Sequence, residues 1–149
     1  MHLCSYAGLL RTKFGRIQKL KAENDSLKLE NMKNVNEMNE MLSTLNEVET
    51  DIRSIRDAEN YLTIQQQSGG ELSQSNREQI KNNMQLISET LKKNREQINK
   101  LQEQLDKSNV KSTALRKTIE RLSSELDQKA NMIVALQEDL AKKNIRIQE

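Results

Sequence analysis

The sequence contains no proline and no tryptophan, and aromatic residues make up only 2% of it. A globular domain of this length normally has several prolines and a wider set of large apolar residues for a compact core. Charged residues, in contrast, make up 31% of the chain, and their signs nearly balance to a net charge of +2. These proportions argue against a compact core and indicate an elongated helical protein.

Residues that carry chemistry are also scarce, because histidine and cysteine occur once each, as His2 and Cys4. A zinc site normally needs three or four protein ligands, so this pair is not expected to bind a metal. The glycines of Gly69-Gly70 lack the strand, the lysine and the further glycines of a phosphate-binding loop. We find no nucleophile beside a base and no distinctive carboxylate pair. The sequence therefore predicts a protein that is not an enzyme and has no catalytic residue, metal or cofactor.

What the chain does have is a heptad repeat, in which apolar residues alternate at spacings of four and three from Ile80 to Ile147. A period of 3.5 residues is typical of a coiled coil, whose a and d positions, here called the seam, face a partner helix. With Ile80 at d, fifteen of twenty seam positions are apolar. A weaker seam runs from Ile17 to Leu62, with ten of fourteen positions apolar. The sequence therefore predicts an all-α protein built as a long coiled coil.

The two seams are out of phase, and the break between them contains Gly69-Gly70. Each glycine inside a helix costs about 1 kcal/mol relative to alanine. After the break, Ser75 with Glu78 forms a capping-box pattern, and Ser73 is a competing N-cap. These signals divide the chain into four expected parts: a short apolar segment at 1–10, a first helix over 11–66, a turn over 67–75, and a second helix over 76–149 that ends in mid-heptad and is interpreted as truncated.

Two helices joined by a short turn most simply pack as an antiparallel pair. In such a pair an a position faces a d position, so a turn centred on Gly69-Gly70 places Ile17 opposite Leu122. We favour this antiparallel two-helix hairpin, with further self-association left open. The alternative is a parallel dimer with a stutter near the glycines, because isoleucine at a with leucine at d favours parallel two-stranded coils.

Polar residues interrupt the downstream seam at five positions. Ser108 and Ser112 form a weak polar stretch, and the other three are Asn94, Lys129 and Lys143. Single polar residues at seam positions commonly fix register and oligomeric state at some cost in stability, and we interpret these three in that way. The two lysines are expected to extend their ammonium groups outward to water. On the outer face, pairs four residues apart such as Glu89 and Lys93 are expected to form ion pairs within the helix.

One basic cluster stands out near the start of the chain, where no acidic residue precedes Glu23. Such a cluster can contact an anionic surface, whether phosphates or lipid headgroups. We weigh this interpretation against an ordinary solvated helix face. The small net charge argues against nucleic acid as a partner. The candidate residues for contact with an anionic surface are Arg11, Lys13, Arg16, Lys19 and Lys21.

The first ten residues are more apolar than any later stretch, but they are too short to span a membrane. They also lack the charged start and the full apolar run of a secretory signal. A single cysteine cannot form an internal disulfide and therefore says little about the redox compartment. Taken alone, these residues predict a soluble cytoplasmic protein.

A resemblance favours a different location. The chain is similar, from about residue 19 onward, to the coiled-coil part of cell-envelope lipoproteins of the Bacteroides group, some of which are labelled collagen-binding adhesin-like. The segments that carry the similarity are KAENDSL at 21–27, LNEVETDIRSIRDAEN at 45–60 and KKNIRIQE at 142–149. In that family a signal peptide ends at a lipid-modified cysteine, and a helical hairpin or stalk follows. The resemblance implies that Cys4 is a candidate lipid anchor, and that an extracellular-matrix protein is a candidate partner.

The sequence and the resemblance together predict a non-catalytic coiled-coil stalk or spacer of an envelope-anchored surface or periplasmic protein, adhesin-like in character. Its membrane association would come only through the lipid anchor, and its other partners would be proteins or further copies of the chain. The alternative is a cytoplasmic coiled-coil scaffold or tethering protein, whose basic cluster docks an anionic partner protein. A lipid on Cys4 would separate the two hypotheses.

Overall fold

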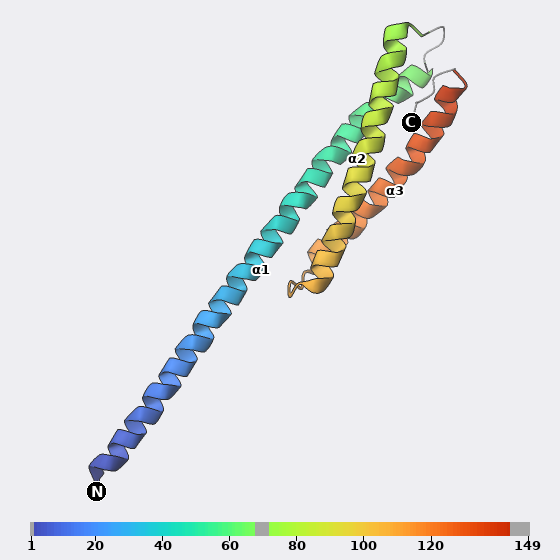
Figure 1. Cartoon of the computed structure of the whole chain (residues 1–149). Coiled ribbons are helices and arrows are strands. Elements are labelled where there is room, and N and C mark those ends of the chain that lie inside the picture. Colours follow the sequence, from blue (N-terminus) through green and yellow to red (C-terminus); the bar gives the residue numbers. More distant parts are fainter. Residues whose placement is uncertain (1, 68–71, 144–149) are drawn as a thin grey trace. The chain divides into compact units, whose positions relative to one another are not determined.

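The computed structural model describes residues 2–67 and 72–143, excluding the side chains of residues 2 and 4. Within these ranges the chain forms three helices and no strand (Figure 1). The helices are α1 (His2–Gln67), α2 (Gln74–Lys107) and α3 (Thr113–Ala141). The prediction of an all-α protein is confirmed.

The chain divides into two units, Met1–Asn39 and Glu40–Glu149. The described part of the first unit is helical throughout. This helix therefore begins earlier than the predicted residue 11, because the described residues of the apolar segment at 1–10 already belong to α1. The sequence offers no proline to interrupt this helix, and an added Cβ at Gly8 or Gly15 would meet no atom within 4 Å.

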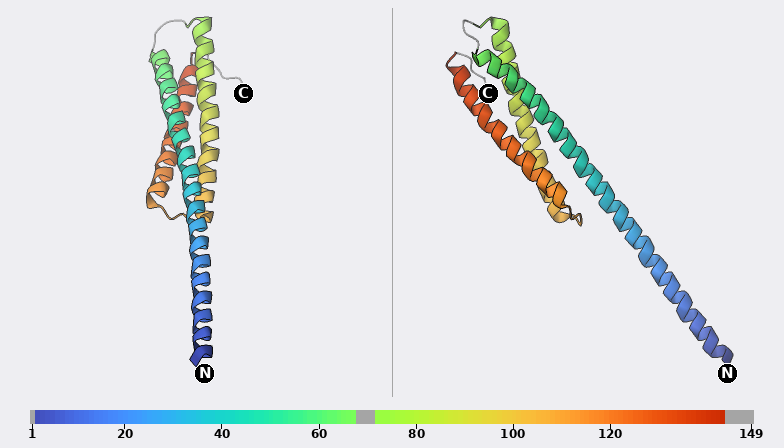
Figure 2. Two further views of the ribbon diagram at one scale, coloured as in Figure 1. Left: turned by 90° about the vertical axis from the view of Figure 1, so that its left-hand side faces the viewer. Right: turned by 180° about the vertical axis from the view of Figure 1, so that it is seen from behind.

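In the second unit, α2 and α3 run side by side in opposite directions (Figure 2). Two ion pairs between them show the direction: Arg95 lies 2.8 Å from Asp127, and Arg116 lies 3.0 Å from Asp106. Residue numbers rise along one helix as they fall along the other, so the pair is antiparallel.

The C-terminal part of α1 completes the second unit by packing along both of these helices. It is antiparallel to α2, because the Tyr61 hydroxyl donates to Gln79 at 2.9 Å and Asn94 donates to Asp51 at 2.8 Å. Its direction matches that of α3, since ion pairs join Glu49 to Arg121 and Glu59 to Lys129. The second unit is thus a three-helix arrangement in which the middle helix runs against the other two.

The core of this unit consists mainly of the seam residues that the heptad pattern selects. Every apolar a or d residue between Met41 and Leu62, and along α2 and α3, is buried. Burial at this spacing is what an amphipathic helix requires when it packs on two neighbours. The seam residues of the core are Met41, Leu45, Val48, Ile52, Ile55 and Leu62 from α1, Ile80, Met84, Ile87, Leu91, Ile98, Leu101 and Leu105 from α2, and Leu115, Ile119, Leu122, Leu126, Ile133, Leu136 and Leu140 from α3. Ala58 of α1 and Val110 of the connection between α2 and α3 are buried outside the seam.

The predicted single helix over 76–149 is wrong, because it is broken over residues 108–112. Ser108 is the C-cap of α2, and Ser112 is the N-cap of α3, whose hydroxyl accepts from the backbone N–H of Leu115 at 3.2 Å. Serine hydroxyls compete with helical hydrogen bonds and so favour helix ends. The helix therefore turns back here, which gives three helices in place of the two-helix hairpin. In the hairpin Ile17 would cover Leu122, whereas here Leu122 is fully buried among the helices of the second unit.

The beginning of α2 also differs from the capping-box prediction. Ser73 is the N-cap, and its hydroxyl accepts from the backbone N–H of Asn76 at 3.1 Å. Ser75 lies inside the helix, so the competing N-cap is the correct one. The turn centre predicted at Gly69-Gly70 and the predicted helix over 144–149 lie outside the described residues.

Candidate functional site

The five residues of the basic cluster all lie on α1 within the first unit, and all five are exposed. Within the described part of the chain, no ion pair involves Arg11, Lys13, Arg16, Lys19 or Lys21. Because no acidic residue precedes Glu23, Arg11, Lys13 and Arg16 have no acidic side chain within one helical turn, whereas Glu23 and Asp25 lie one turn beyond Lys19 and Lys21. The positive potential of Arg11, Lys13 and Arg16 is therefore directed at solvent.

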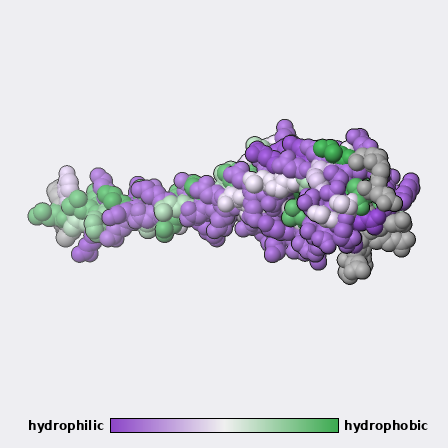
Figure 3. All heavy atoms as spheres, turned by 90° about the horizontal axis from the view of Figure 1, so that it is seen from above, coloured by the Kyte–Doolittle hydropathy of each residue, from purple (hydrophilic) through white to green (hydrophobic). Residues whose placement is uncertain are grey.

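The same stretch of α1 also exposes large apolar residues, each more than half accessible to solvent. Green hydrophobic spheres are visible among the hydrophilic ones at the N-terminal end in Figure 3. At 100° per residue, the apolar residues fall within an arc of about 140°. The residues of this apolar arc are Tyr6, Leu9, Leu10, Phe14, Ile17 and Leu20.

The apolar arc is wider than a coiled-coil seam. Leu9 and Phe14 lie at g and e of the heptad frame that contains Ile17, so seam analysis alone misses them. On the same helical projection, Arg11 and Arg16 flank the two edges of the arc. In the sequence, the wider apolar face was indicated by Leu9 and Phe14, which are apolar residues outside the seam. The result is an amphipathic basic helix face rather than two independent features.

The candidate lipid anchor, Cys4, lies in the described helix α1 by its backbone. Its side chain is outside the described structure, so the lipidation hypothesis stays a prediction.

Asn94, the first polar seam residue, is fully buried in the second unit. Its amide nitrogen donates to Asp51 on α1 at 2.8 Å and to Gln97 on α2 at 2.9 Å. Its carbonyl oxygen has no hydrogen-bond partner within the described structure. The residue joins α2 to α1, which agrees with a role in fixing register.

Lys129 does not extend outward to water, so this part of the sequence interpretation is wrong. Its ammonium lies 2.8 Å from Glu59 on α1, and the two side chains are only 17% and 4% exposed. The second carboxylate oxygen of Glu59 has no hydrogen-bond partner in the described structure. Lys129 turns inward because leaving the buried carboxylate of Glu59 without a countercharge would cost more free energy than removing the lysine ammonium from water.

Lys143 likewise turns inward, toward the end of α1. Its ammonium donates to the backbone carbonyls of Gln65 and Gln66, at 3.2 and 2.6 Å. The last carbonyls of a helix have no partner within the helix, and a cation there also complements the negative end of the helix dipole. Lys143 therefore supports the C-terminus of α1 rather than binding an outside ligand.

On the surface, Lys93 pairs with α1 and not with Glu89, so the predicted pair within the helix is wrong. Its ammonium lies 2.8 Å from Glu47 and 3.3 Å from Asp51. Hydrogen bonds to Glu47 and then to Asp51 raise the pKa of Lys93 above its ordinary value of 10.5. A lysine is already charged at neutral pH, and a raised pKa moves its titration farther from neutrality. The shift thus indicates a structural contact rather than acid–base chemistry.

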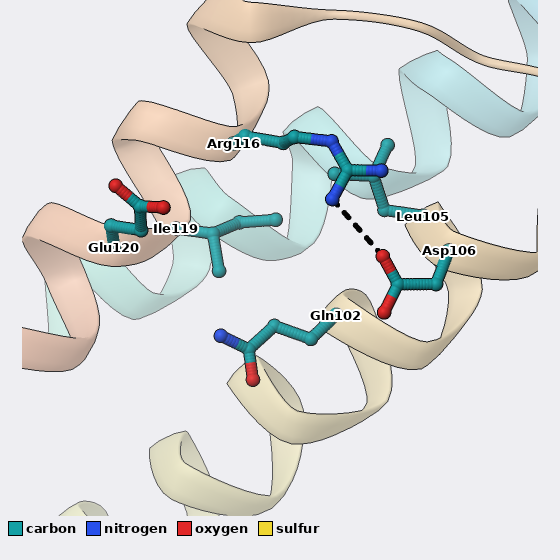
Figure 4. Close-up of a pocket in the computed structure, with 6 residues that line it drawn as sticks. All are labelled: Gln102, Leu105, Asp106, Arg116, Ile119 and Glu120. Carbon is teal, nitrogen blue, oxygen red and sulfur yellow. Dashed lines mark hydrogen bonds and ion pairs between the residues drawn. The ribbon is translucent and has the colours of Figure 1, made fainter.

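A hollow of about 300 Å³ lies between the ends of α2 and α3 that adjoin the 108–112 connection. Figure 4 shows that Arg116 reaches across it from α3 to Asp106 on α2. Leu105 and Ile119, both core residues, form its apolar part. Glu120 is the remaining charged side chain of the lining, and no histidine, lysine, cysteine or hydroxyl side chain lines the hollow with it to form an acid–base or nucleophile pair.

The described residues contain neither a cluster of metal-ligand side chains nor a membrane-spanning helix. No group of three or more histidine, cysteine, aspartate or glutamate side chains is placed to hold a metal ion. None of the described helices has a stretch that is both long and apolar enough to cross a bilayer.

The basic cluster and the apolar arc of the first unit are thus the surface that the packing of the second unit does not explain. Comparison with known proteins adds no identification, because no family model, no curated protein and no solved structure matches the chain.

Proposed function

We propose that the chain is a non-catalytic helical spacer or tether. The observation that carries this proposal is a change in burial along α1. Its seam residues are buried from Met41 to Leu62, whereas Leu10, Ile17 and Leu20, in the same heptad frame, are exposed. A seam that continues in phase beyond its own core is a surface suited to an outside partner.

The two units divide the work of such a tether. The second unit has a core of its own, so it can serve as a stable module. Helical residues 2–39 of the first unit span about 57 Å at 1.5 Å per residue, which gives reach. The mechanism is mechanical: the helix sets a distance, and its exposed face sets what is bound.

The proposal of a protein without catalytic activity rests on the roles of the buried polar groups. Asn94, Lys129 and Lys143 each bond to α1 and so stabilise packing between helices. Polar side chains in an active site would instead converge on a space that a substrate can enter.

The resemblance to envelope lipoproteins specifies a location for this tether. In that form of the proposal Cys4 carries a lipid, the protein is anchored in the cell envelope, and its partner is an extracellular-matrix protein. Mass spectrometry of the N-terminal peptide from natively expressed protein tests it, together with partition between membrane and soluble fractions. A diacyl or triacyl mass on Cys4 is expected; a free thiol in a protein of the soluble fraction would leave the cytoplasmic scaffold as the better hypothesis.

The spacer itself is tested by a distance measurement inside the first unit. Spin labels are placed at Ser5→Cys and Asn39→Cys in a Cys4→Ser background. A continuous helix predicts a narrow distribution centred near about 50 Å. A broad distribution at much shorter distances would refute the spacer, because a collapsed segment cannot set a length. Labels at Asn76→Cys and Asn99→Cys within α2 serve as the matched control for helix order.

A further inference from the structure

We propose that residues 3–20 of α1 form a site that binds an anionic lipid surface, with the helix lying in the plane of the membrane interface. This inference names what the N-terminal end of the proposed tether holds, and in that sense rests on the proposed function. It goes beyond the lipid anchor, because it requires no modification of Cys4.

The apolar arc supplies the first argument. Six large side chains, among them Tyr6 and Phe14, are more than half exposed on one side of the helix. An arc of about 140° over five turns is the width that an interfacial helix buries at the boundary between headgroups and acyl chains. Aromatic residues at that depth are favourable because their rings partition into the interface.

Charge supplies the second argument. The first 22 residues contain five lysine or arginine residues and no aspartate or glutamate. Arg11 and Arg16 flank the apolar arc, where their guanidinium groups would meet lipid phosphates as the arc enters the interface. Lys13 projects within the arc itself, and its long apolar stem allows the ammonium to reach the headgroups.

The same residues make a second copy of the chain a poor occupant of this face. In a parallel dimer Lys13 would lie in the seam, opposite its own counterpart. Arg16 at g would face Lys21 at e of the other helix, a pair of like charges. Ten cations would then gather over three heptads without a single carboxylate. An anionic surface removes this repulsion, whereas a second copy doubles it.

A nucleic acid would satisfy the cations but not the apolar arc. Phosphate contacts need only lysine and arginine, and they leave Leu10 and Ile17 facing water. A membrane interface uses both halves of the amphipathic face. No described helix of the chain could cross a bilayer, so an orientation in the plane of the interface is the one that fits.

Sedimentation with vesicles tests the site, using the full chain with Cys4→Ser so that neither lipid nor disulfide contributes. One set of vesicles contains equal amounts of phosphatidylglycerol and phosphatidylcholine, and the other contains phosphatidylcholine alone. Strong binding is expected only to the first set, with affinity falling as salt rises. Equal binding to both sets, or binding to neither, would overturn the proposal.

Two variants separate the contributions of charge and apolar burial. Replacing Arg11, Arg16 and Lys19 with glutamine should weaken binding about a hundredfold, because each cation near the surface contributes a factor of about five. The charge-matched control replaces Lys28, Lys33 and Lys100 with glutamine and should bind almost as wild type. If the control loses as much affinity for the vesicles as the first variant, the proposal that binding is localised to the basic cluster is wrong.

The apolar variant is Leu10→Gln with Phe14→Gln, and its matched control is Leu27→Gln with Leu29→Gln farther along α1. The first pair should lose about a hundredfold in affinity, and the second should change it little. If the first pair binds as wild type, the cluster adsorbs through charge alone and the in-plane helix is refuted. If that pair instead abolishes a dimer seen by analytical ultracentrifugation, and no variant binds vesicles, the face belongs to a second copy.

The spin-label measurement separates failure of this site from failure of the tether. Absent vesicle binding with a narrow distribution near about 50 Å would remove the lipid site and leave the spacer intact. A collapsed distance with retained vesicle binding would remove the spacer and leave a lipid-binding segment.

Discussion

Replacing Lys129 with methionine should destabilise the second unit more than any other change to a charged residue there. The ammonium of Lys129 is 2.8 Å from Glu59, whose side chain is 4% exposed. Methionine keeps the length of the side chain, so the change removes the charge and leaves little space unfilled. The carboxylate of Glu59 then stays buried without a countercharge.

The expected cost is about 3 kcal/mol in the free energy of unfolding. Removing one partner of a buried ion pair typically costs about 3–5 kcal/mol. We take the lower end because Lys129 is 17% exposed, so water can reach part of the site. Glu59→Leu should cost less, since the flexible lysine that remains can move its ammonium to solvent. The double variant Glu59→Leu with Lys129→Met should be as stable as wild type or more stable, by up to about 4 kcal/mol.

Urea denaturation followed by circular dichroism at 222 nm checks these values in all four forms of the double-mutant cycle. With a slope of about 2 kcal/mol per molar urea, Lys129→Met should lower the midpoint by about 1.5 M without changing the slope. Lys117→Met, on the exposed face of α3, is the control and should change stability by less than about 0.5 kcal/mol. The reasoning is refuted if Lys129→Met costs no more than this control, or if the double variant is the least stable of the four.

Three further predictions concern the same unit. Ser73→Ala should lower stability by about 1 kcal/mol through loss of the N-cap bond, whereas Ser75→Ala should have little effect; equal costs in thermal melts would contradict the assigned cap. Leu122→Ala should cost about 2–5 kcal/mol because this side chain is fully buried, and Val134→Ala, at an exposed position, should cost far less. The contribution of Lys93 to the free energy of unfolding should be complete below pH 10.5 and lost as the pH rises through its raised folded-state pKa. In denaturation measured at several pH values, Lys93→Met should therefore remove this part of the loss of stability at alkaline pH.

The heptad pattern predicted the core of the second unit except for Ala58 and Val110, which lie outside the seam. It succeeded because burial follows the spacing of apolar residues on each helix, and this spacing is the same whether one helix or two pack against it. For that reason the pattern could not give the number of helices. The break at 108–112 depends on Ser108 and Ser112, which were recognised only as weak seam positions. Their hydroxyls end one helix and begin the next, an effect of hydrogen bonding that periodicity does not measure.

The candidate surface was predicted only in part. The basic residues were visible in the sequence as a run without acids, and the structure places all of them on an exposed helix. The apolar half was missed because analysis by seam positions considers a and d alone, and so leaves out Leu9 and Phe14. Only when the helix is treated as a cylinder in contact with a surface do these residues and the cations form one face.

The buried polar residues show how a seam can select one packing arrangement over another. In the two-helix hairpin with its turn at Gly69-Gly70, Glu59 would face Ile80, and Lys129 would face Leu10. Neither charge would then have an opposite charge across the seam, so each would lie buried without a partner or have to turn out to solvent. In the three-helix unit the two charges meet each other at 2.8 Å, and Lys143 reaches free carbonyls at the end of α1. The polar seam residues therefore favour α1 and α3 lying side by side over the hairpin. Matching of opposite charges across seams, applied together with periodicity, distinguishes arrangements that periodicity alone leaves equal.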